Sequence, residues 1–166
     1  MAVGNLEFIN SFSTTSASTL SADNVFTTDY DVYKIVMTPM DKSTDSEHLF
    51  RFLDSGGSEI SSANYDYASL EMYGHTGFTQ RRTTGAGSIA YLGNGDRNQA
   101  IMYVYNPADT GSYSFVQYQS SGGTSTLLRG EKGIGVLKLS ALHRGFIIRA
   151  NTGTYSDLSV SIYGVK

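Results

Sequence analysis

The chain lacks cysteine and tryptophan altogether and has only two prolines in its 166 residues. Without cysteine it forms neither a disulfide framework nor a zinc-thiolate site, which excludes disulfide-stapled scaffolds and zinc-finger-like domains. No apolar run approaches the roughly 20 residues that a transmembrane helix needs. Residues 1–5 also lack the basic start and apolar core of a signal peptide. We therefore expect synthesis in a cytoplasm and no membrane insertion.

The chain also lacks an excess of positive charge. Its formal net charge is -3 and its pI is about 5.5, whereas domains that neutralise nucleic-acid phosphates usually carry a surplus of lysine and arginine. Nucleic acid is therefore not an expected partner. The length fits a single domain over residues 1–166 with one hydrophobic core, which needs no metal or disulfide to fold.

Glycine and tyrosine are abundant instead, with 18 and 12 residues. Many glycines stand in short clusters between segments in which apolar and polar side chains alternate, which is the period of a half-buried β-strand. In the last such segment Leu158, Val160 and Ile162 share one face, whereas Ser159 and Ser161 share the other. No segment has a helical period, so an all-β domain of antiparallel sheets, a sandwich or a barrel, is predicted.

A series of strand candidates follows from this pattern. They cover residues 6–12, 18–26, 32–37, 48–53, 64–73, 88–92, 99–106, 112–119, 125–129, 135–139, 145–150 and 158–163. The run at 32–37 is rich in β-branched and aromatic residues and is predicted to be a central strand. Polar stretches predict a loop at 39–46, an exposed loop or loosely held hairpin at 74–87, a tight Asn-Gly turn at 93–96 and a hairpin turn at 130–135.

Both faces of the strand candidate at 99–106 are apolar. One face carries Ile101, Tyr103 and Tyr105, and the other carries Ala100, Met102 and Val104. Because a solvated strand face is normally polar, we expect both faces to be covered, and a loop of the same chain is favoured over a neighbouring subunit as the second cover. Tyrosine rings bury a large area while their hydroxyls bond to water or a partner, so they suit either an oligomer seam or a carbohydrate platform.

Catalytic motifs are absent from the sequence. The histidines, His48, His75 and His143, have no evident partner set for acid–base chemistry, and no Gly-x-Ser-x-Gly motif occurs. The acids near turns are interpreted as solvated residues rather than as a glycosidase pair. They are Asp45, Glu47, Asp54, Glu59, Asp66 and Glu71.

Ligand-binding motifs are missing as well. The alternating acids Asp41, Asp45 and Glu47 lack the glycine and the final acid of an EF-hand loop. The glycine-rich segment at 130–135 lacks the Walker spacing and carries an acid where phosphate would bind. We therefore expect no catalytic residue, no metal site and no cofactor.

Several phrases occur together in an order typical of one group of proteins. They are DYDVYKI at 29–35, LFRF at 49–52, SGGS at 55–58, NYDYA at 64–68, YNP at 105–107, GFIIRANTG at 145–153 and IYGVK at 162–166. In this order the chain resembles small virion structural and tail-fibre domains of tailed phages, particularly marine ones. The resemblance covers nearly the whole chain.

The resemblance implies a jelly-roll-like antiparallel β-sandwich on the surface of a virion, usually a homotrimer, that binds other proteins and catalyses no reaction. Its expected partners are further copies of itself and phage capsid or tail proteins. The leading interpretation is a decoration protein that bridges neighbouring capsid or tail subunits. The alternative is a receptor-binding tip that recognises glycans of the host surface.

The alternative interpretation places the glycan contact on the polar stretch at 73–87. Its candidate surface contacts are Tyr73, His75, Arg81 and Arg82. The two arginines would bind lipopolysaccharide phosphates or an acidic patch of a capsid protein, and a merely solvated loop is the competing explanation that we favour for them.

Overall fold

A computed structural model describes residues 5–89, 92, 94–95, 97–124 and 126–166. These residues form strands and no helix, which confirms the predicted all-β class. The strands are β1 (Leu6–Thr14), β2 (Thr19–Ala22), β3 (Val32–Lys42), β4 (Ser46–Leu53), β5 (Tyr65–Tyr73), β6 (Gly77–Ala86), β7 (Asn94–Gly95), β8 (Arg97–Tyr105), β9 (Ser114–Gly123), β10 (Leu128–Leu137), β11 (Gly145–Ala150) and β12 (Tyr155–Val165).

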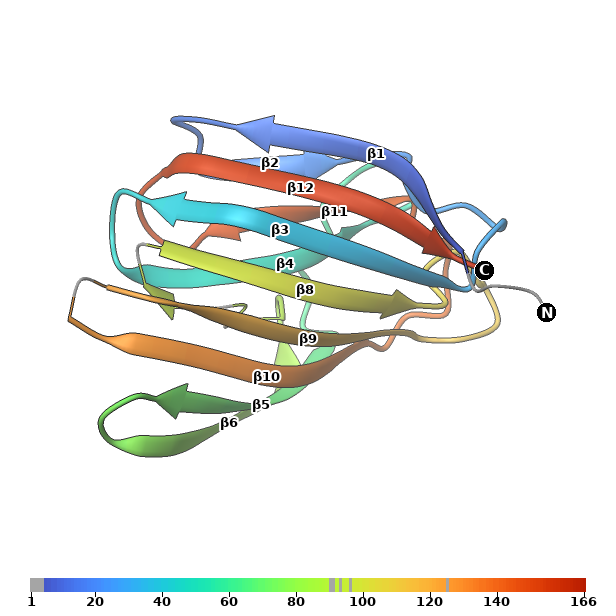
Figure 1. The fold of residues 1–166 in the computed structure, drawn as a ribbon. Coiled ribbons are helices and arrows are strands. Elements are labelled where there is room, and N and C mark those ends of the chain that lie inside the picture. The colour runs from blue at the N-terminus through green and yellow to red at the C-terminus, as the bar shows by residue number, and fades with distance from the viewer. Residues whose placement is uncertain (1–4, 90–91, 93, 96, 125) are drawn as a thin grey trace.

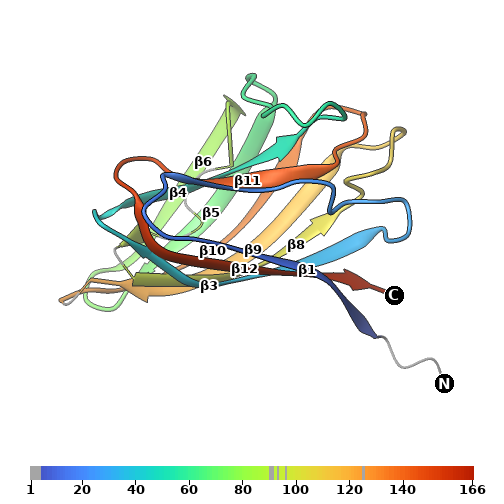
Figure 2. The ribbon, with the colours of Figure 1, turned by 90° about the horizontal axis from the view of Figure 1, so that it is seen from above.

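The strands form two sheets that pack face to face (Figures 1 and 2). The larger sheet has eight strands in the order β1-β12-β3-β8-β9-β10-β5-β6, and the smaller has four in the order β2-β11-β4-β7. Every described strand pair is antiparallel. The half-sheet β1-β12-β3-β8 faces the sheet β2-β11-β4-β7, with the chain alternating between them, as in a jelly roll. The predicted jelly-roll-like sandwich is therefore confirmed.

Two hairpins make the larger sheet wider than the smaller one. Strands β9 and β10 add to β8, and strands β5 and β6 add to β10. In Figure 1 the β5–β6 hairpin lies at the lower edge of the larger sheet, beyond strands β2, β11 and β4 of the smaller sheet. The added strands thus lengthen one layer of the sandwich without lengthening the other.

The core lies between the inward faces of the two sheets and follows the two-residue period of each strand. On β3 the inward residues Tyr33, Ile35 and Met37 are fully buried, as are Phe50 and Phe146 of the smaller sheet. The two phenylalanine rings stack with their centroids 5.4 Å apart. Because β3 pairs with β12 on one side and β8 on the other, its prediction as a central strand is confirmed.

Buried tyrosines attach the loops at the ends of the strands to this core. The hydroxyl of Tyr33 donates to the carbonyl of Thr27 at 2.8 Å, and that of Tyr65 donates to the carbonyl of Ile60 at 3.0 Å. A buried phenol needs such a partner, since an unbonded hydroxyl in the core destabilises the fold. These tyrosines therefore fill the core with their rings and hold the neighbouring loops with their hydroxyls.

The loop predicted at 39–46 is too long, because the connection in the structure spans only residues 43–45. Strand β3 continues through Pro39 to Lys42, and β4 already begins at Ser46. The polar sequence is misleading here because the buried ammonium of Lys42 donates to Oγ of Ser46 at 3.0 Å and to the Ser46 carbonyl. Burial lowers the pKa of Lys42 to about 8.

The hairpin turn predicted at 130–135 is wrong, because these residues lie within β10. Two of their glycines, Gly133 and Gly135, face inward and leave room for larger neighbours. A Cβ on Gly133 would lie 2.4 Å from the ring of Tyr118, and one on Gly135 would lie 2.8 Å from the side chain of Ile89. The glycines are therefore packing residues of a strand rather than turn residues.

The remaining turn predictions have different outcomes. Residues 74–87 form the turn and second strand of an exposed hairpin, β5–β6, in agreement with one of the two predicted forms. The turn predicted at 93–96 includes Gly93 and Asp96, which lie outside the described residues. Asn94 and Gly95 form β7 and pair with Glu47 and Ser46.

The inward glycines of β10 lead to a test of packing. Gly133→Ala is expected to lower the free energy of unfolding by about 1–3 kcal/mol, because the added methyl group must displace the buried ring of Tyr118. Chemical unfolding followed by tyrosine fluorescence measures this change. Gly111→Ala is the control, since its Cβ would meet only the Asp109 carboxylate at 3.3 Å. Equal stabilities of the two variants would contradict the role of Gly133.

Candidate functional site

The outward face of the larger sheet carries large apolar side chains that no described segment of the chain covers. Ile101 is 43% exposed, Phe115 is 43% exposed and Ile134 is 59% exposed. The prediction that a loop of the same chain covers the second face of strand β8 is therefore wrong. The outward face is left for solvent, for a ligand or for another protein.

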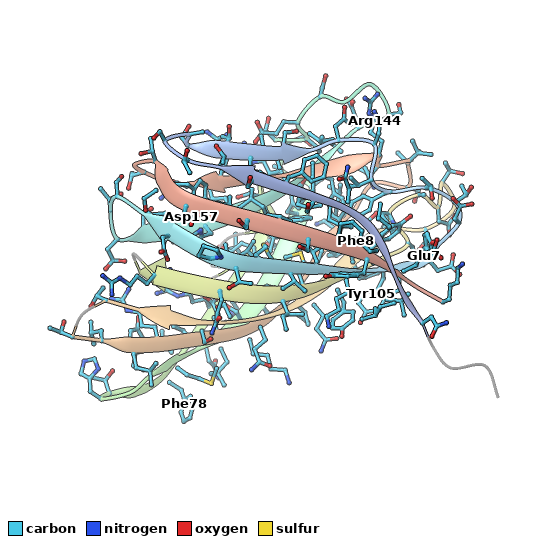
Figure 3. The ribbon with its side chains drawn as sticks, turned by 45° about the horizontal axis from the view of Figure 1, so that its top comes forward. Glu7, Phe8, Phe78, Tyr105, Arg144 and Asp157 are labelled. Atoms are coloured by element: carbon cyan, nitrogen blue, oxygen red, sulfur yellow. The ribbon has the colours of Figure 1, made fainter. Side chains whose placement is uncertain are left out.

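Over β9, β10, β5 and β6 many of the outward side chains are apolar. We name this group the apolar patch, and it consists of Ala68, Leu70, Phe78, Phe115, Ile134 and Val136. Ile134 stands opposite Ala68, and Val136 stands opposite Phe115. A hollow of about 720 Å³ lies over the patch and is also lined by Asp66 and Arg82. Figure 3 shows Phe78 projecting from the edge hairpin.

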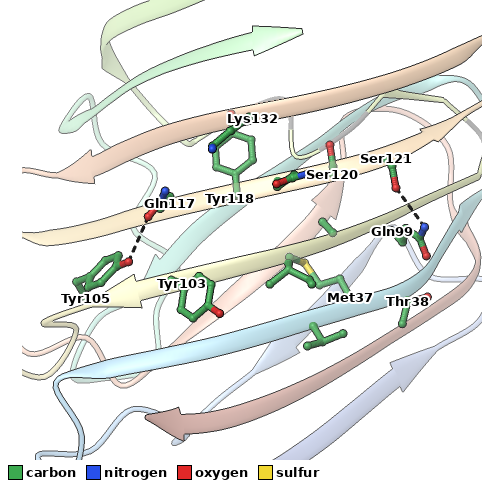
Figure 4. A pocket seen from close by; sticks show the side chains of 14 residues that line it. Met37, Thr38, Gln99, Tyr103, Tyr105, Gln117, Tyr118, Ser120, Ser121 and Lys132 are labelled. Atoms are coloured by element: carbon green, nitrogen blue, oxygen red, sulfur yellow. Dashed lines mark hydrogen bonds between the residues drawn. The ribbon is translucent and has the colours of Figure 1, made fainter. Parts of the chain in front are cut away.

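Beside the apolar patch, over β3, β8, β9 and β10, lies a groove of about 610 Å³ with a more polar lining. We name it the amide groove after its three glutamines. Its outward side chains include Gln99, Tyr103 and Tyr105 of β8, Gln117, Gln119 and Ser121 of β9, and Lys132 of β10 (Figure 4). Alternation on two neighbouring strands places these side chains on one face.

Most hydrogen-bonding groups of the amide groove are unused. The Tyr105 hydroxyl donates to Oε1 of Gln117 at 3.3 Å, and Nε2 of Gln99 donates to Oγ of Ser121 at 3.1 Å. These bonds leave the Gln117 amide nitrogen and the Gln99 amide oxygen available. With the described residues, the side chain of Gln119 forms no hydrogen bond. The groove therefore offers donors and acceptors next to tyrosine rings.

The candidate contacts predicted at 73–87 do not form one site. Tyr73 ends β5 and packs edge-on against His75 of the turn, with ring centroids 6.2 Å apart. Arg82 faces outward and lines the hollow of the apolar patch. Arg81 faces inward, where its Nε donates to Oε2 of Glu71 at 2.8 Å. The hairpin thus divides these residues between its tip and its two faces.

Two buried glutamates lie side by side under the extension of the larger sheet. Glu71 of β5 and Glu131 of β10 stand directly opposite each other, and each is 1% exposed. Arg81 pairs with Glu71, and the hydroxyl of Ser69 donates to Oε1 of Glu131. Burial, together with the neighbouring charge of Glu71, raises the pKa of Glu131 to about 8. The interpretation of Glu71 as a solvated turn acid is therefore wrong.

The other predicted turn acids have varied surroundings. Asp54 accepts the backbone N–H groups of Gly56 and Ser58 at 2.9 and 2.8 Å, as expected for a turn residue. Glu59 instead bridges Arg51 at 2.6 Å and Arg149 at 3.1 Å. The strand pairing that brings both arginines to Glu59 could not be predicted from the sequence.

Two of the three histidines have buried partners. Nδ1 of His143 lies 2.8 Å from Oγ of Ser114, and Nδ1 of His48 lies 3.1 Å from the hydroxyl of Tyr155. His48, His143 and Ser114 have no exposed surface, so no substrate reaches either imidazole. Burial lowers the pKa of His143 to about 4 and that of His48 well below its ordinary value. These pairs fill the core.

Among the described residues, no group of three or more acids and histidines is arranged to hold a metal ion. None of these residues belongs to a helix long and apolar enough to cross a membrane.

No family model and no curated protein matches the chain. Two solved structures show weak similarity. The chain aligns over 97% of its length with 34% of an E230A fructofuranosidase from Schwanniomyces occidentalis complexed with fructosylnystose, at 7% identity and a TM-score of 0.29. It aligns over 99% of its length with 42% of a chain in the structure of the infectious bursal disease virus Gt strain, at 10% identity and a TM-score of 0.15. The chain spans less than half of either neighbour, and neither similarity assigns a family or an activity.

The buried Glu131 leads to a prediction about pH. Because its pKa in the folded state is raised to about 8 from 4.5, the native state keeps a proton that the unfolded chain loses. The free energy of unfolding should therefore fall as pH rises from 5 to 8, by at most about 1.4 kcal/mol per pH unit from this group. Glu131→Gln, which is neutral at every pH, should remove this part of the slope.

Urea unfolding at several pH values between 5 and 8 measures the slope. Asp157→Asn, at an exposed carboxylate on β12, is the control and should retain the wild-type slope. Parallel curves for wild type and Glu131→Gln would show that Glu131 is ionised in the folded protein.

Proposed function

We propose that this chain is a non-enzymatic structural protein on the surface of a tailed-phage particle, where it decorates the capsid or tail as a homotrimer. The apolar patch carries this proposal. A group of exposed large apolar side chains on one sheet face is a typical mark of a protein–protein interface. The jelly roll adds support, since viral capsid proteins are among those that use this fold. The fold by itself does not determine the role.

Two apolar surfaces at opposite edges of the larger sheet are suited to a ring of copies. The apolar patch extends to the edge strand β6, while Leu6 and Phe8, which are 49% and 58% exposed, lie on the opposite edge strand, β1. Figure 3 shows Phe8 and Phe78 far apart across this sheet. In a threefold ring each copy presents one surface to the next copy and a different surface to the previous one. We therefore assign the patch of one copy to the β1 edge of its neighbour.

The buried histidines support a role in binding rather than in catalysis. A nucleophile and its base must reach a substrate, but His143 and Ser114 are enclosed by the core. The proposal therefore places the activity of the protein on its surface.

The trimer makes a prediction about mass in solution. By light scattering after size exclusion, the wild type should have three times the 18.0 kDa mass of one chain. Ile134→Lys and Phe8→Lys should each yield monomers, because each introduces a charge into the apolar contact at a side chain that is more than half exposed. The near-ultraviolet circular dichroism of each variant should stay that of the wild type.

Tyr113→Lys is the matched control. Tyr113 is 45% exposed and lies in the loop before β9 rather than on the sheet, so this variant should stay trimeric. A wild-type monomer at all concentrations, or trimers of both sheet variants, would refute this arrangement of copies.

A decorating role makes a prediction about particles. Particles stripped of the protein should release DNA at a lower temperature than intact ones, since many weak attachments held together stabilise the assembly. A DNA-binding dye in a thermal ramp measures the release. Adding back the wild type should restore the original temperature, whereas Ile134→Lys should not. Stripped particles that are as resistant as intact ones would contradict the decorating role.

A further inference from the structure

The amide groove has a composition that the proposed assembly does not use. An apolar partner seated in it would bury the amide nitrogen of Gln117 and the amide of Gln119 without hydrogen bonds, and each unsatisfied polar group costs about 1–3 kcal/mol. A fitting occupant therefore carries many hydroxyl groups. The volume of the groove, about 610 Å³, lies within the usual range of ligand pockets.

The groove also has a distinct charge. Lys34 stands opposite Tyr103, and Lys132 stands opposite Gln119, so a cation lies on each side of the groove. Among the described residues, those that face outward from β8, β9, β10 and residues 32–37 of β3 include Arg97 as well but no carboxylate. This surface is positive on a chain whose net charge is -3. The charge favours an anionic ligand.

Tyrosine rings are the third feature of the groove, after its amides and its charge. Tyr103 and Tyr105 extend from the same face of β8, and both line the groove (Figure 4). A tyrosine ring offers a rigid flat surface with a polar end, which suits a ligand that has both apolar C–H faces and hydroxyl groups. Sugar rings have this combination.

From these three features we infer that the amide groove binds an anionic glycan. The glutamine amides bond to sugar hydroxyls, the tyrosine rings pack against sugar faces, and Lys132 and Lys34 pair with a carboxylate or sulfate group. This site lies on the sheet, away from the tip of the β5–β6 hairpin, where the sequence had placed a glycan contact. It does not depend on the proposed trimer or on the attachment to a particle.

Isothermal titration calorimetry with three soluble glycans tests the inference. The probes are a heptamer of galacturonic acid, a sulfated dextran of similar length and the neutral maltoheptaose. At least one anionic probe should bind more tightly than maltoheptaose, and its binding should weaken as salt rises. The stronger of the two anionic probes identifies the charged group. Equal binding of the neutral probe, or binding of none of the three at millimolar concentration, would overturn the inference.

Variants on the sheet face locate the binding. The double variant Gln117→Ala/Gln119→Ala should weaken the best anionic probe about tenfold. Tyr103→Ala should weaken it about threefold to tenfold, and Lys132→Gln should remove much of its salt dependence. Gln80→Ala is the control, since Gln80 is an exposed glutamine on β6 that does not line the groove. Equal affinities of the control and the double variant would overturn the inference.

The same titration on Ile134→Lys separates this site from the assembly. Glycan binding that persists in this variant, whatever its oligomeric state, agrees with a site formed within one chain. Loss of binding in Ile134→Lys, with Gln117→Ala/Gln119→Ala unaffected, would place the ligand on the apolar patch and overturn the assignment to the amide groove.

Discussion

The difference in width between the two sheets determines most of what the molecule exposes. A four-stranded sheet covers only part of the inward face of an eight-stranded sheet and none of its outward face. Burial of apolar surface therefore closes the core where the two sheets overlap. The smaller sheet does not cover the inward side of β10, β5 and β6 beyond that overlap, and paired polar groups occupy this region. It also leaves the whole outward face of the larger sheet uncovered, and that face is suited to binding.

The polar groups under β5 and β10 replace the missing part of the smaller sheet. Buried carboxylates are costly unless they are paired, hydrogen-bonded or protonated. Glu71 meets the guanidinium of Arg81, while Glu131 accepts a hydrogen bond from Ser69 and has a pKa that burial raises to about 8. Arg81 also ties the edge strand β6 to its neighbour β5. The exposed cation Arg82 on the same strand discourages another sheet from pairing with this edge.

Features that lie along a single strand could be predicted from the sequence. Strand β11 coincides with its predicted range, because a buried apolar run there is bounded by turn residues. Prediction failed where a strand contains residues typical of turns. Lys42 is polar but hydrogen-bonded within the fold, and Gly133 is required by the ring of Tyr118. In both cases a contact distant in the sequence overrides the local preference.

Features that depend on neighbouring strands could not be predicted. Glu71 and Glu131 meet only because β5 inserts beside β10. Likewise, Gln99 and Gln119 line one groove only after β8 and β9 pair in register. The one available signal was the polar alternation of Gln117, Gln119 and Ser121 along β9. It indicated an outward face but not what that face holds.

A groove formed by outward side chains of strands has a consequence for how such a protein changes over generations. On β9 the residues that line the groove alternate with residues that fill the core. Gln119 therefore contributes to the surface, whereas its neighbour Tyr118 contributes to the packing of the core. Replacement at an outward position alters the exposed surface while leaving the inward packing intact. Such a scaffold can follow a changing target through single substitutions on its surface, with little risk to its ability to fold.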